Sequence, residues 1–243
     1  MQPTKDYRAS HLERGASYDS YLASVPFDTY MADWERRHLV AIVGQLFPSG
    51  GPVRYLDFAC GTGRVAAAVA PLCQSALGID ISSSMLSVAR QKVPRVTFRQ
   101  ADLTTEDPDL GEFDLVTSFR FFGNAQDELR EGALRAIVKR MAPAGYLIIN
   151  SHRNPRSLAS LFDRLTGGNA GNMDLHLGKL RAMLERHGLR IRKLRPIGAW
   201  MYRSKLLNAY RSDDPRAIAN EQRFSRPWLA AISPDLIVVA QRS

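Results

Sequence analysis

The chain has 243 residues, of which 45% are hydrophobic and 23% charged, a composition typical of one large globular domain. It has no apolar run near the ~18 residues of a membrane-spanning helix, and its charged N-terminus does not resemble a secretion signal, which predicts a cytoplasmic protein without a membrane span. Residues 181–243 carry 13 Lys and Arg against 5 Asp and Glu, so this region holds most of the net charge of +9. A basic region of this kind favours an acidic small molecule, an anionic lipid or a nucleic acid as partner. The alternative is a solvated basic face without a specific partner.

Residues 1–48 are expected to form an N-terminal helical cap. Aromatic and aliphatic side chains recur from Tyr18 to Tyr30, and a clearer helix is expected over residues 31–47. Pro and Gly at residues 48–52 then interrupt the helical pattern. We therefore divide the chain into this cap and a core domain over residues 49–243.

The first part of the core domain alternates strands with helices. Strands are predicted at residues 53–59, 75–79, 95–100, 113–119 and 146–150, and helices at residues 64–72, 82–91 and 126–141. Such alternation predicts an α/β fold with a right-handed, doubly wound parallel sheet that helices cover on both faces.

The last part of the chain completes this sheet in a different way. A helix is expected at residues 175–187, followed by strands at 190–197 and 234–240, which gives a Rossmann-like, mostly parallel sheet of seven strands. About 35 residues without an obvious crossover helix join the last two strands, which is typical of an antiparallel pair. We therefore expect an antiparallel last strand and an inserted cap at about residues 200–233.

Small or charged residues follow four of the predicted strands. Gly61 and Gly63 follow the first strand, where they permit a tight turn and the close approach of a ligand to helix N-terminal amides. Asp80 ends the second strand and could accept hydrogen bonds from a ribose diol, or simply cap a helix. Asp102 follows the third strand and Arg120 the fourth. Ligands of doubly wound sheets bind outside these carboxyl ends, so the four segments predict one binding site.

These segments also resemble a known family. In chain order, they are Leu56–Gly63, Gly78–Leu86, Gln100–Leu103, Phe113–Val116 and Pro143–Leu147, and they are similar to those of class I S-adenosylmethionine-dependent methyltransferases. The resemblance covers roughly residues 40–200 and implies S-adenosylmethionine as the cofactor. A nicotinamide-dependent oxidoreductase is the alternative, because the third glycine of a dinucleotide fingerprint is here Ala66, a tolerated replacement.

The resemblance also implies roles for individual residues. Gly61 and Gly63 would line the methionine moiety, and Asp80 would hold the ribose hydroxyls. Ile81 or Met85 would pack on the adenine, with Asp102 and Leu103 at its edge, and Tyr18 would close over the cofactor. Asp57 could serve the site by holding the glycine turn. The complete predicted cofactor site is Tyr18, Asp57, Ala59, Gly61, Gly63, Asp80, Ile81, Met85, Asp102, Leu103, Ser118 and Phe119.

The methyl acceptor is narrowed mainly by exclusion. The segment after the fourth strand, from Ser118 to Asn124, lacks the prolines of base-amino methyltransferases and the carboxylate that a catechol-type Mg²⁺ site needs, so no catalytic metal is expected. Neither Cys60 nor Cys73 lies in the Pro-Cys motif of cytosine C5 enzymes. Both thiols are expected to be reduced and buried.

Two residues are candidates for the chemistry. His152 could accept a proton from the acceptor or merely hold its loop. Arg120 could bind a carboxylate or phosphate of the acceptor, or pair with an acid of the fold. His11 and His176 are weaker candidates, and His38 and His187 are expected on helix surfaces.

The predicted function is methyl transfer to O or N of a small, anionic or partly aromatic metabolite. An RNA-directed methyltransferase is the alternative that the basic C-terminal region supports, and a non-catalytic binding protein is a further one.

Overall fold

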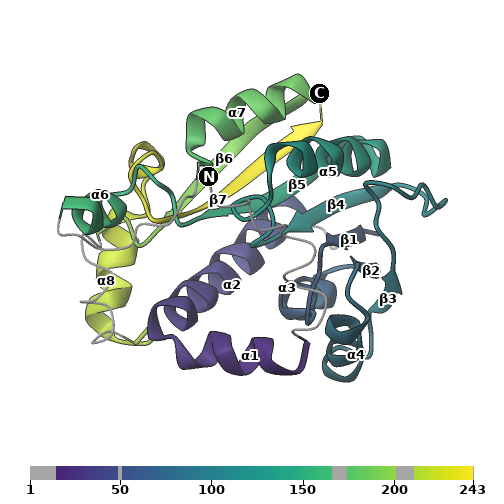
Figure 1. The fold of residues 1–243 in the computed structure, drawn as a ribbon, viewed down its shortest axis with the longest axis horizontal. Helices are drawn as coiled ribbons and strands as arrows, with labels where there is room; N and C mark the ends of the chain where they lie inside the picture. Colours follow the sequence, from purple (N-terminus) through teal and green to yellow (C-terminus); the bar gives the residue numbers. More distant parts are fainter. Residues whose placement is uncertain (1–14, 49–50, 166–173, 201–210, 243) are drawn as a thin grey trace, which may run out of the picture.

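The structure is a computed structural model that describes residues 15–48, 51–165, 174–200 and 211–242 (Figure 1). In this part of the chain seven strands form one sheet in the order β3-β2-β1-β4-β5-β7-β6. The strands are β1 (Arg54–Phe58), β2 (Ser75–Asp80), β3 (Thr97–Gln100), β4 (Phe113–Ser118), β5 (Met141–His152), β6 (Leu189–Ile197) and β7 (Asp235–Arg242). Neighbouring strands from β1 to β5 pair in parallel, whereas β7 is antiparallel to both β5 and β6. The expected Rossmann-like sheet with an antiparallel last strand is confirmed.

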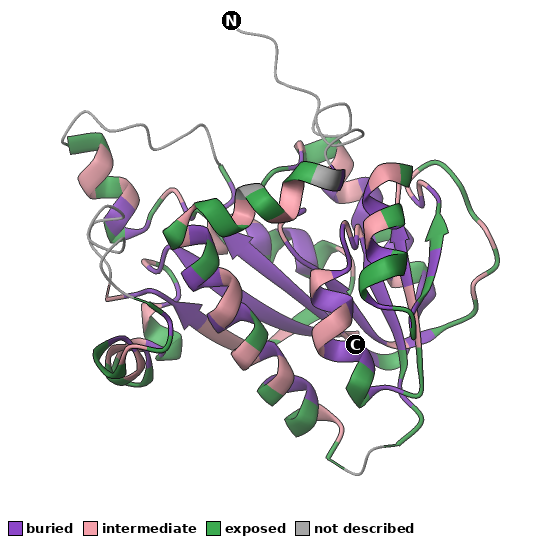
Figure 2. Ribbon diagram, turned by 90° about the horizontal axis from the view of Figure 1, so that it is seen from below, coloured by how far each residue is buried: buried purple, intermediate pink, exposed green. Residues whose placement is uncertain are grey.

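Helices cover both faces of the sheet. They are α1 (Gly15–Ser24), α2 (Pro26–Leu46), α3 (Arg64–Val69), α4 (Ser83–Lys92), α5 (Asp127–Arg140), α6 (Leu158–Leu165), α7 (Leu177–Arg186) and α8 (Pro215–Phe224), with short 3-10 turns η1 (Ala70–Leu72) and η3 (Pro227–Leu229). Figure 1 shows α5 and α7 above the sheet and α2, α3 and α4 below it. The strands are mainly buried and the helices expose their outer faces (Figure 2).

Three apolar clusters attach these helices to the sheet, and one of them joins α3 and α4 to β3. Ile137 of α5 and Leu184 of α7 join one buried cluster with residues of β1, β4 and β5. Trp34 and Ile42 of α2 join a second cluster, which contains Tyr55 of β1. Helix α2 therefore packs directly on the sheet. The division into a cap over residues 1–48 and a core over residues 49–243 stays a prediction.

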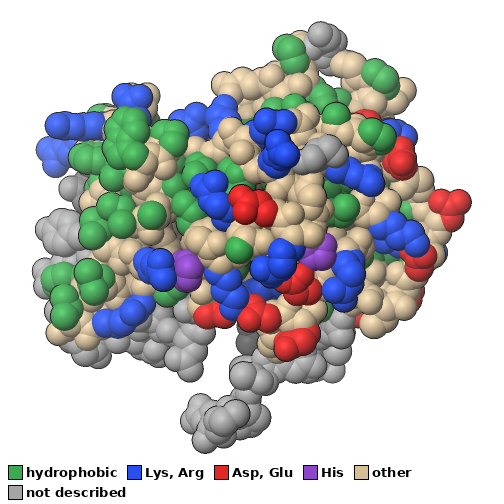
Figure 3. Space-filling model, turned by 90° about the horizontal axis from the view of Figure 1, so that it is seen from above, with side chains coloured by type: hydrophobic (Ala, Val, Ile, Leu, Met, Phe, Trp, Pro, Cys, Tyr) green, Lys and Arg blue, Asp and Glu red, His purple; other side chains and the backbone are tan. Residues whose placement is uncertain are grey.

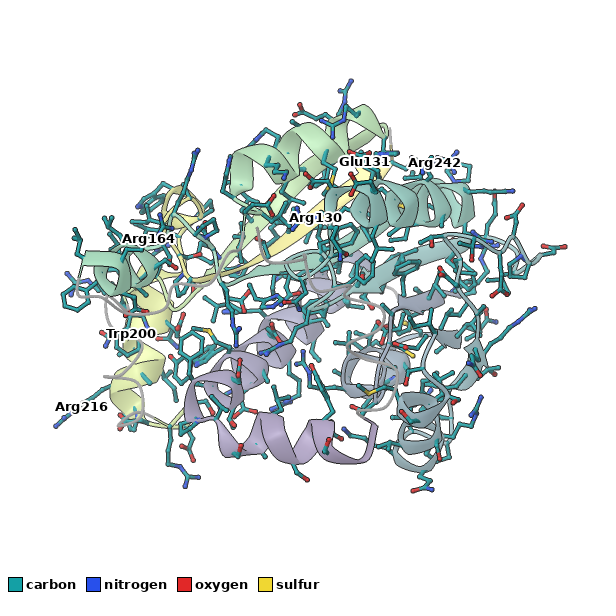
Figure 4. All side chains as sticks on the ribbon, viewed as in Figure 1. Arg130, Glu131, Arg164, Trp200, Arg216 and Arg242 are labelled. Carbon is teal, nitrogen blue, oxygen red and sulfur yellow. The ribbon has the colours of Figure 1, made fainter. Side chains whose placement is uncertain are left out.

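Helix α8 is held against α2 by one buried carboxylate. Glu221 Oε1 accepts hydrogen bonds from the Tyr30 hydroxyl at 3.0 Å, the Gly198 amide at 2.9 Å and the Trp200 indole at 3.1 Å. Trp200 is labelled in Figure 4. This junction lies within the inserted cap expected at about residues 200–233, of which residues 201–210 lie outside the described part of the chain.

The structure differs from the sequence-based prediction at two elements. Strand β5 begins at Met141, which pairs with Phe113, and the expected turn before residue 146 is an irregularity inside the strand. Gly145 permits it, because a Cβ there would lie 2.9 Å from the Ala142 carbonyl oxygen. Helix α6 was not predicted at all; three of its leucines, Leu158, Leu161 and Leu165, are exposed.

Two simpler expectations can be compared with the structure directly. Cys60 and Cys73 are buried, free thiols. Among the described helices, none combines the length and the apolar composition that crossing a membrane requires.

Candidate active site

A cavity of about 420 Å³ opens at the carboxyl ends of the central strands. Ten of the twelve residues predicted for the cofactor line it: Tyr18, Asp57, Ala59, Gly61, Asp80, Ile81, Met85, Asp102, Leu103 and Phe119. Arg120 and His152 line it as well. Gly63 and Ser118 do not. A Cβ on Gly63 would touch Ala89 and Phe98, so this glycine faces α4 and β3, and the Ser118 side chain is fully buried.

The turn after β1 and the end of β2 are joined by Asp80. Its Oδ2 accepts a hydrogen bond from the Gly61 amide at 2.8 Å, and its Oδ1 accepts one from the Ser82 amide at 2.9 Å. Gly61 adopts a φ of 54°, and the position of its missing Cβ has nothing within 4 Å. A carboxylate in this position is the type of group that accepts hydrogen bonds from a vicinal diol.

Asp57 lies beneath the same turn and is almost fully buried. Its Oδ1 accepts a hydrogen bond of 2.7 Å from the Thr117 hydroxyl, which is itself 2.7 Å from the Tyr55 hydroxyl. Burial raises the pKa of Asp57 to about 7, although the hydrogen bond from Thr117 opposes the shift. Asp57 is therefore anchored to two neighbouring strands at the floor of the cavity.

The loop after β3 is organised by Asp102. Its Oδ1 accepts hydrogen bonds from the Thr104 amide at 3.0 Å and from the Thr104 hydroxyl at 2.6 Å. Leu103 is buried and lines the cavity beside Met85 of α4. The loop thus presents an apolar surface and a carboxylate next to each other.

Helix α1 covers the cavity from the side of α4. The Gly15 amide donates to the Ser84 hydroxyl at 3.3 Å. Asp19 accepts hydrogen bonds of 2.7 Å from the Thr62 hydroxyl and from Lys92. These contacts tie α1 to the glycine turn and to α4, and they bring Tyr18 to the cavity.

A buried charged network closes the other end of the cavity. Glu35 of α2 accepts from Asn150 Nδ2 at 2.6 Å and forms an ion pair of 2.8 Å with Arg64. Arg120 forms an ion pair of 2.9 Å with Asp28, and its Nε lies 3.9 Å from Glu35. Burial lowers the pKa of Arg120, but Glu35 and other acids outweigh this effect and raise it. Of the two roles expected for Arg120, the described geometry shows the pairing with acids of the fold.

His152 ends β5 and is only 7% exposed. Its Nδ1 has no hydrogen-bond partner among the described residues. Burial, followed by the charges of Arg120, Arg153 and Arg64, holds the pKa of His152 well below 6.5. The imidazole is therefore neutral at physiological pH and a weak base.

The other histidines lie elsewhere. His176 Nδ1 caps α7 by accepting from the Lys179 amide at 3.3 Å, and His187 Nε2 is 2.6 Å from Glu131. His38 is partly buried beside Trp34, with burial lowering its pKa to about 4, so it is not the surface residue that was expected. His11 lies outside the described residues.

Several residues that line or support the cavity were not predicted as site residues from the sequence. Asp28, Arg64, Asn124 and Arg153 line the cavity, and Glu35 supports it from behind. Arg130 of α5, labelled in Figure 4, supports the loop after β4 by donating to the Phe122 carbonyl at 2.8 Å. Only Arg153 could have been suggested by its position directly after a strand.

The chain is similar to known methyltransferases. A family described as "Methyltransferase domain" matches residues 56–145. The dTDP-4-amino-2,3,4,6-tetradeoxy-D-glucose N,N-dimethyltransferase of Saccharopolyspora spinosa is 31% identical over 123 residues, covering 48% of this chain and 47% of that protein. The magnesium-protoporphyrin O-methyltransferase of Rhodobacter capsulatus is 27% identical over 135 residues, covering 46% and 59%. The chain thus spans about half the length of these curated relatives.

Several solved structures resemble nearly the whole chain. The magnesium protoporphyrin IX methyltransferase of Synechocystis PCC 6803 superposes with a TM-score of 0.68 at 15% identity, covering 97% of this chain and 98% of that one. At this identity the likeness concerns the fold. Residues 56–145 therefore match a methyltransferase domain, within a chain whose fold is similar to that of the Synechocystis structure.

Proposed function

We propose that the protein is an S-adenosylmethionine-dependent methyltransferase that acts on an oxygen or nitrogen atom of a small molecule. The observation that carries the proposal is the position of Asp80, held by the Gly61 and Ser82 amides beside the unobstructed backbone of Gly61. The match of residues 56–145 to a methyltransferase domain supports it. So does the Synechocystis structure, which was solved with bound S-adenosylhomocysteine.

The residues at the cavity fit this cofactor. Asp80 would accept hydrogen bonds from the ribose hydroxyls, and Met85 and Leu103 offer an apolar surface for the adenine. The open face of Gly61 leaves room for the methionine moiety. When bound, the cofactor supplies a sulfonium methyl group, whose carbon an acceptor lone pair can attack with a neutral thioether as the leaving group.

The chain's own contribution to such a transfer is alignment. An in-line displacement is accelerated mainly by holding donor and acceptor in the reactive geometry, without a strong base. Helix α1, held by Asp19 and Gly15, brings Tyr18 and Leu22 over the cavity, where they would exclude water. Arg120 and Glu35 would fix the wall against which the acceptor lies.

The RNA-directed alternative is less well supported. Basic side chains lie across the face shown in Figure 3, with acidic ones between many of them. Several arginines of the C-terminal part are also engaged, such as Arg186 with Glu131 and Arg211 with Asp213. A steep fall in affinity with salt would be needed to revive an RNA substrate.

Calorimetry with S-adenosylmethionine, S-adenosylhomocysteine and NADH tests the proposed function. We expect the two sulfur ligands to bind and NADH not to bind. Asp80→Asn should weaken binding at least about tenfold, because a hydrogen bond to a charged group contributes roughly 1.5–3 kcal/mol. Asp109→Asn, an exposed acid outside the cavity, is the matched control and should bind like the parent. Binding of NADH alone, or of none of the three, would refute the proposal.

A further inference from the structure

We propose that the methyl acceptor is a carboxylate, that Arg153 binds it, and that the product is a methyl ester. This inference rests on the proposed function and names the substrate class of the same site. It starts from the acceptor end of the cavity, beyond the residues assigned to the cofactor. There, Arg64, Arg120, His152 and Arg153 line one wall.

The three arginines of this wall differ in how their charges are used. Arg64 is paired with Glu35 at 2.8 Å and Arg120 with Asp28 at 2.9 Å. Arg153 is exposed and lines the cavity, and within the described residues its side chain has neither an ion pair nor a hydrogen bond. Its guanidinium is therefore the cation that can offer a fork of two N–H donors to a planar carboxylate.

His152 precedes Arg153 at the same wall and is buried to more than nine-tenths. Its Nδ1 is shielded from the cavity, and a Cβ on Gly123 would lie 3.0 Å from it, so this atom faces the loop after β4. The carboxylate would therefore be held by Arg153, beside the neutral ring of His152.

The chemistry of the wall selects a carboxylate over an alcohol or an amine. An alcohol must lose a proton during transfer, and an ammonium group must lose one beforehand. His152 is a poor proton acceptor because the surrounding arginines and its burial favour the neutral ring. Asp28 is engaged with Arg120, and Asp57 is bonded to Thr117. A carboxylate needs no base, since it is ionised before it binds.

The step balances without any proton transfer. A carboxylate oxygen donates a lone pair to the methyl carbon and forms the new O–C bond. The C–S bond breaks, and its electron pair remains on the sulfur, which becomes a neutral thioether. An anion and a sulfonium cation thus give a neutral ester and a neutral sulfide.

The test compares three probes with the same skeleton and different head groups. They are 3-phenylpropionate, 3-phenylpropionamide and 3-phenylpropylammonium, each titrated calorimetrically into protein saturated with S-adenosylhomocysteine. We expect the carboxylate to bind about tenfold or more tightly than the amide, because the hydrogen bonds to Arg153 are charge-assisted. The ammonium probe should not bind at millimolar concentrations.

Variants identify the residue. Arg153→Gln should weaken binding of 3-phenylpropionate about tenfold and leave that of the amide unchanged. Arg156→Gln removes an exposed arginine three residues away that does not line the cavity, and it should bind all three probes like the parent. In turnover with methyl-labelled S-adenosylmethionine, the label should become volatile after alkaline treatment, because esters release methanol and methyl ethers and amines do not.

Three results would overturn the inference. They are equal binding of amide and carboxylate, absence of carboxylate binding at millimolar concentrations, and an Arg153→Gln variant that binds the carboxylate normally. Failure of S-adenosylhomocysteine to bind would instead contradict the proposed function. The first titration therefore separates the two failures.

Discussion

Glu35 and Asp235 are two carboxyl groups that lie behind the cavity, and isosteric amide substitutions of them should have opposite effects on stability. Glu35 is 1% exposed and Asp235 2%. Burial raises the pKa of Glu35, but Arg64 and then Arg120 outweigh burial and lower it. For Asp235, burial raises the pKa, Glu35 raises it further, and Arg120 opposes the shift without reversing it. At a pH between these two pKa values, the native protein therefore holds a protonated Asp235 beside an ionised Glu35.

The sign of the pH effect of Asp235 follows from linkage. Its unfolded pKa is near 3.8, and its folded pKa lies well above that value. Between these two pKa values, the native state binds up to one more proton than the unfolded state. The stabilisation is therefore complete below the unfolded pKa and is lost as pH rises, at no more than about 1.4 kcal/mol per pH unit.

Asp235→Asn should remove this pH dependence. The amide oxygen can still accept the hydrogen bond of 2.8 Å from the Leu236 amide, and its NH₂ group can face Glu35 without a shared proton. The free energy of unfolding of this variant, relative to the parent, should rise with pH by up to about 1.4 kcal/mol per unit within the titration window. At pH values above that window the variant should be the more stable protein.

Glu35→Gln should act in the opposite direction. It removes the charge that Arg64 and Arg120 face inside the protein, and breaking a buried ion pair costs about 3–5 kcal/mol. A cost at the lower end of this range is expected, because the Arg64 side chain is 22% exposed and can be partly hydrated. This loss should be present above the unfolded pKa of Glu35, near 4.5, and should diminish as pH falls through its lowered folded value.

Urea unfolding followed by circular dichroism, from about pH 5 to about pH 8, measures both effects. The parent and the two variants are compared at each pH, and equal slopes of unfolding free energy against urea would show that compactness is unchanged. The assignment of protons would be refuted if Asp235→Asn were less stable than the parent by an amount that is constant, or that grows, as pH rises.

Further predictions concern helix α1, which covers the cavity, and the proposed chemistry. Gly15→Ala should displace α1 and weaken binding of S-adenosylmethionine by about 1–3 kcal/mol, because the new methyl group would lie 2.3 Å from the Ser84 carbonyl oxygen. Gly44→Ala, in open space on α2, should instead stabilise the protein by about 0.5–1 kcal/mol without changing the dissociation constant for S-adenosylmethionine. Equal affinities of the two variants for S-adenosylmethionine would contradict the close contact between Gly15 of α1 and Ser84. His152→Gln should retain kcat/KM within about tenfold and leave its pH profile unchanged around pH 6.5, whereas loss of a proton acceptor would lower it about 100-fold or more.

The sequence predicts those parts of the molecule whose structure is encoded locally. Alternating apolar segments and turn residues are enough to place the seven strands within a few residues, because strand and helix periodicity needs no distant partner. Gly61 and Asp80 are equally accessible to this reasoning, since Gly61 lies in the turn after β1 and Asp80 ends β2. The start of β5 was placed too late because Pro143 and Gly145 favour a turn, and the pairing of Met141 with Phe113 overrides that preference.

The charged end of the cavity could not be predicted in this way. Glu35 lies within an amphipathic helix where an acid is unremarkable, and its partner Asn150 is 115 residues further along the chain. Asp28 is likewise separated from Arg120 by 92 residues. Only the packing of α2 against the sheet brings these groups together. The sequence alone therefore leaves two roles open for Arg120, which are binding of the acceptor and pairing with an acid of the fold.

Backbone strain is concentrated at the same place. Ala59, Arg120 and Arg153 adopt left-handed conformations with φ of 56°, 58° and 55°, and all three line the cavity just beyond the ends of β1, β4 and β5. Such a conformation costs about 1–2 kcal/mol for a residue with a Cβ and persists where surrounding contacts over-determine it. For Arg120 those contacts are evident, since its amide donates to Asn150 Oδ1 at 2.5 Å and its guanidinium pairs with Asp28. The Arg153 side chain has no comparable contact within the described residues. A bound carboxylate would give Arg153 an ion pair like the one that Arg120 forms with Asp28.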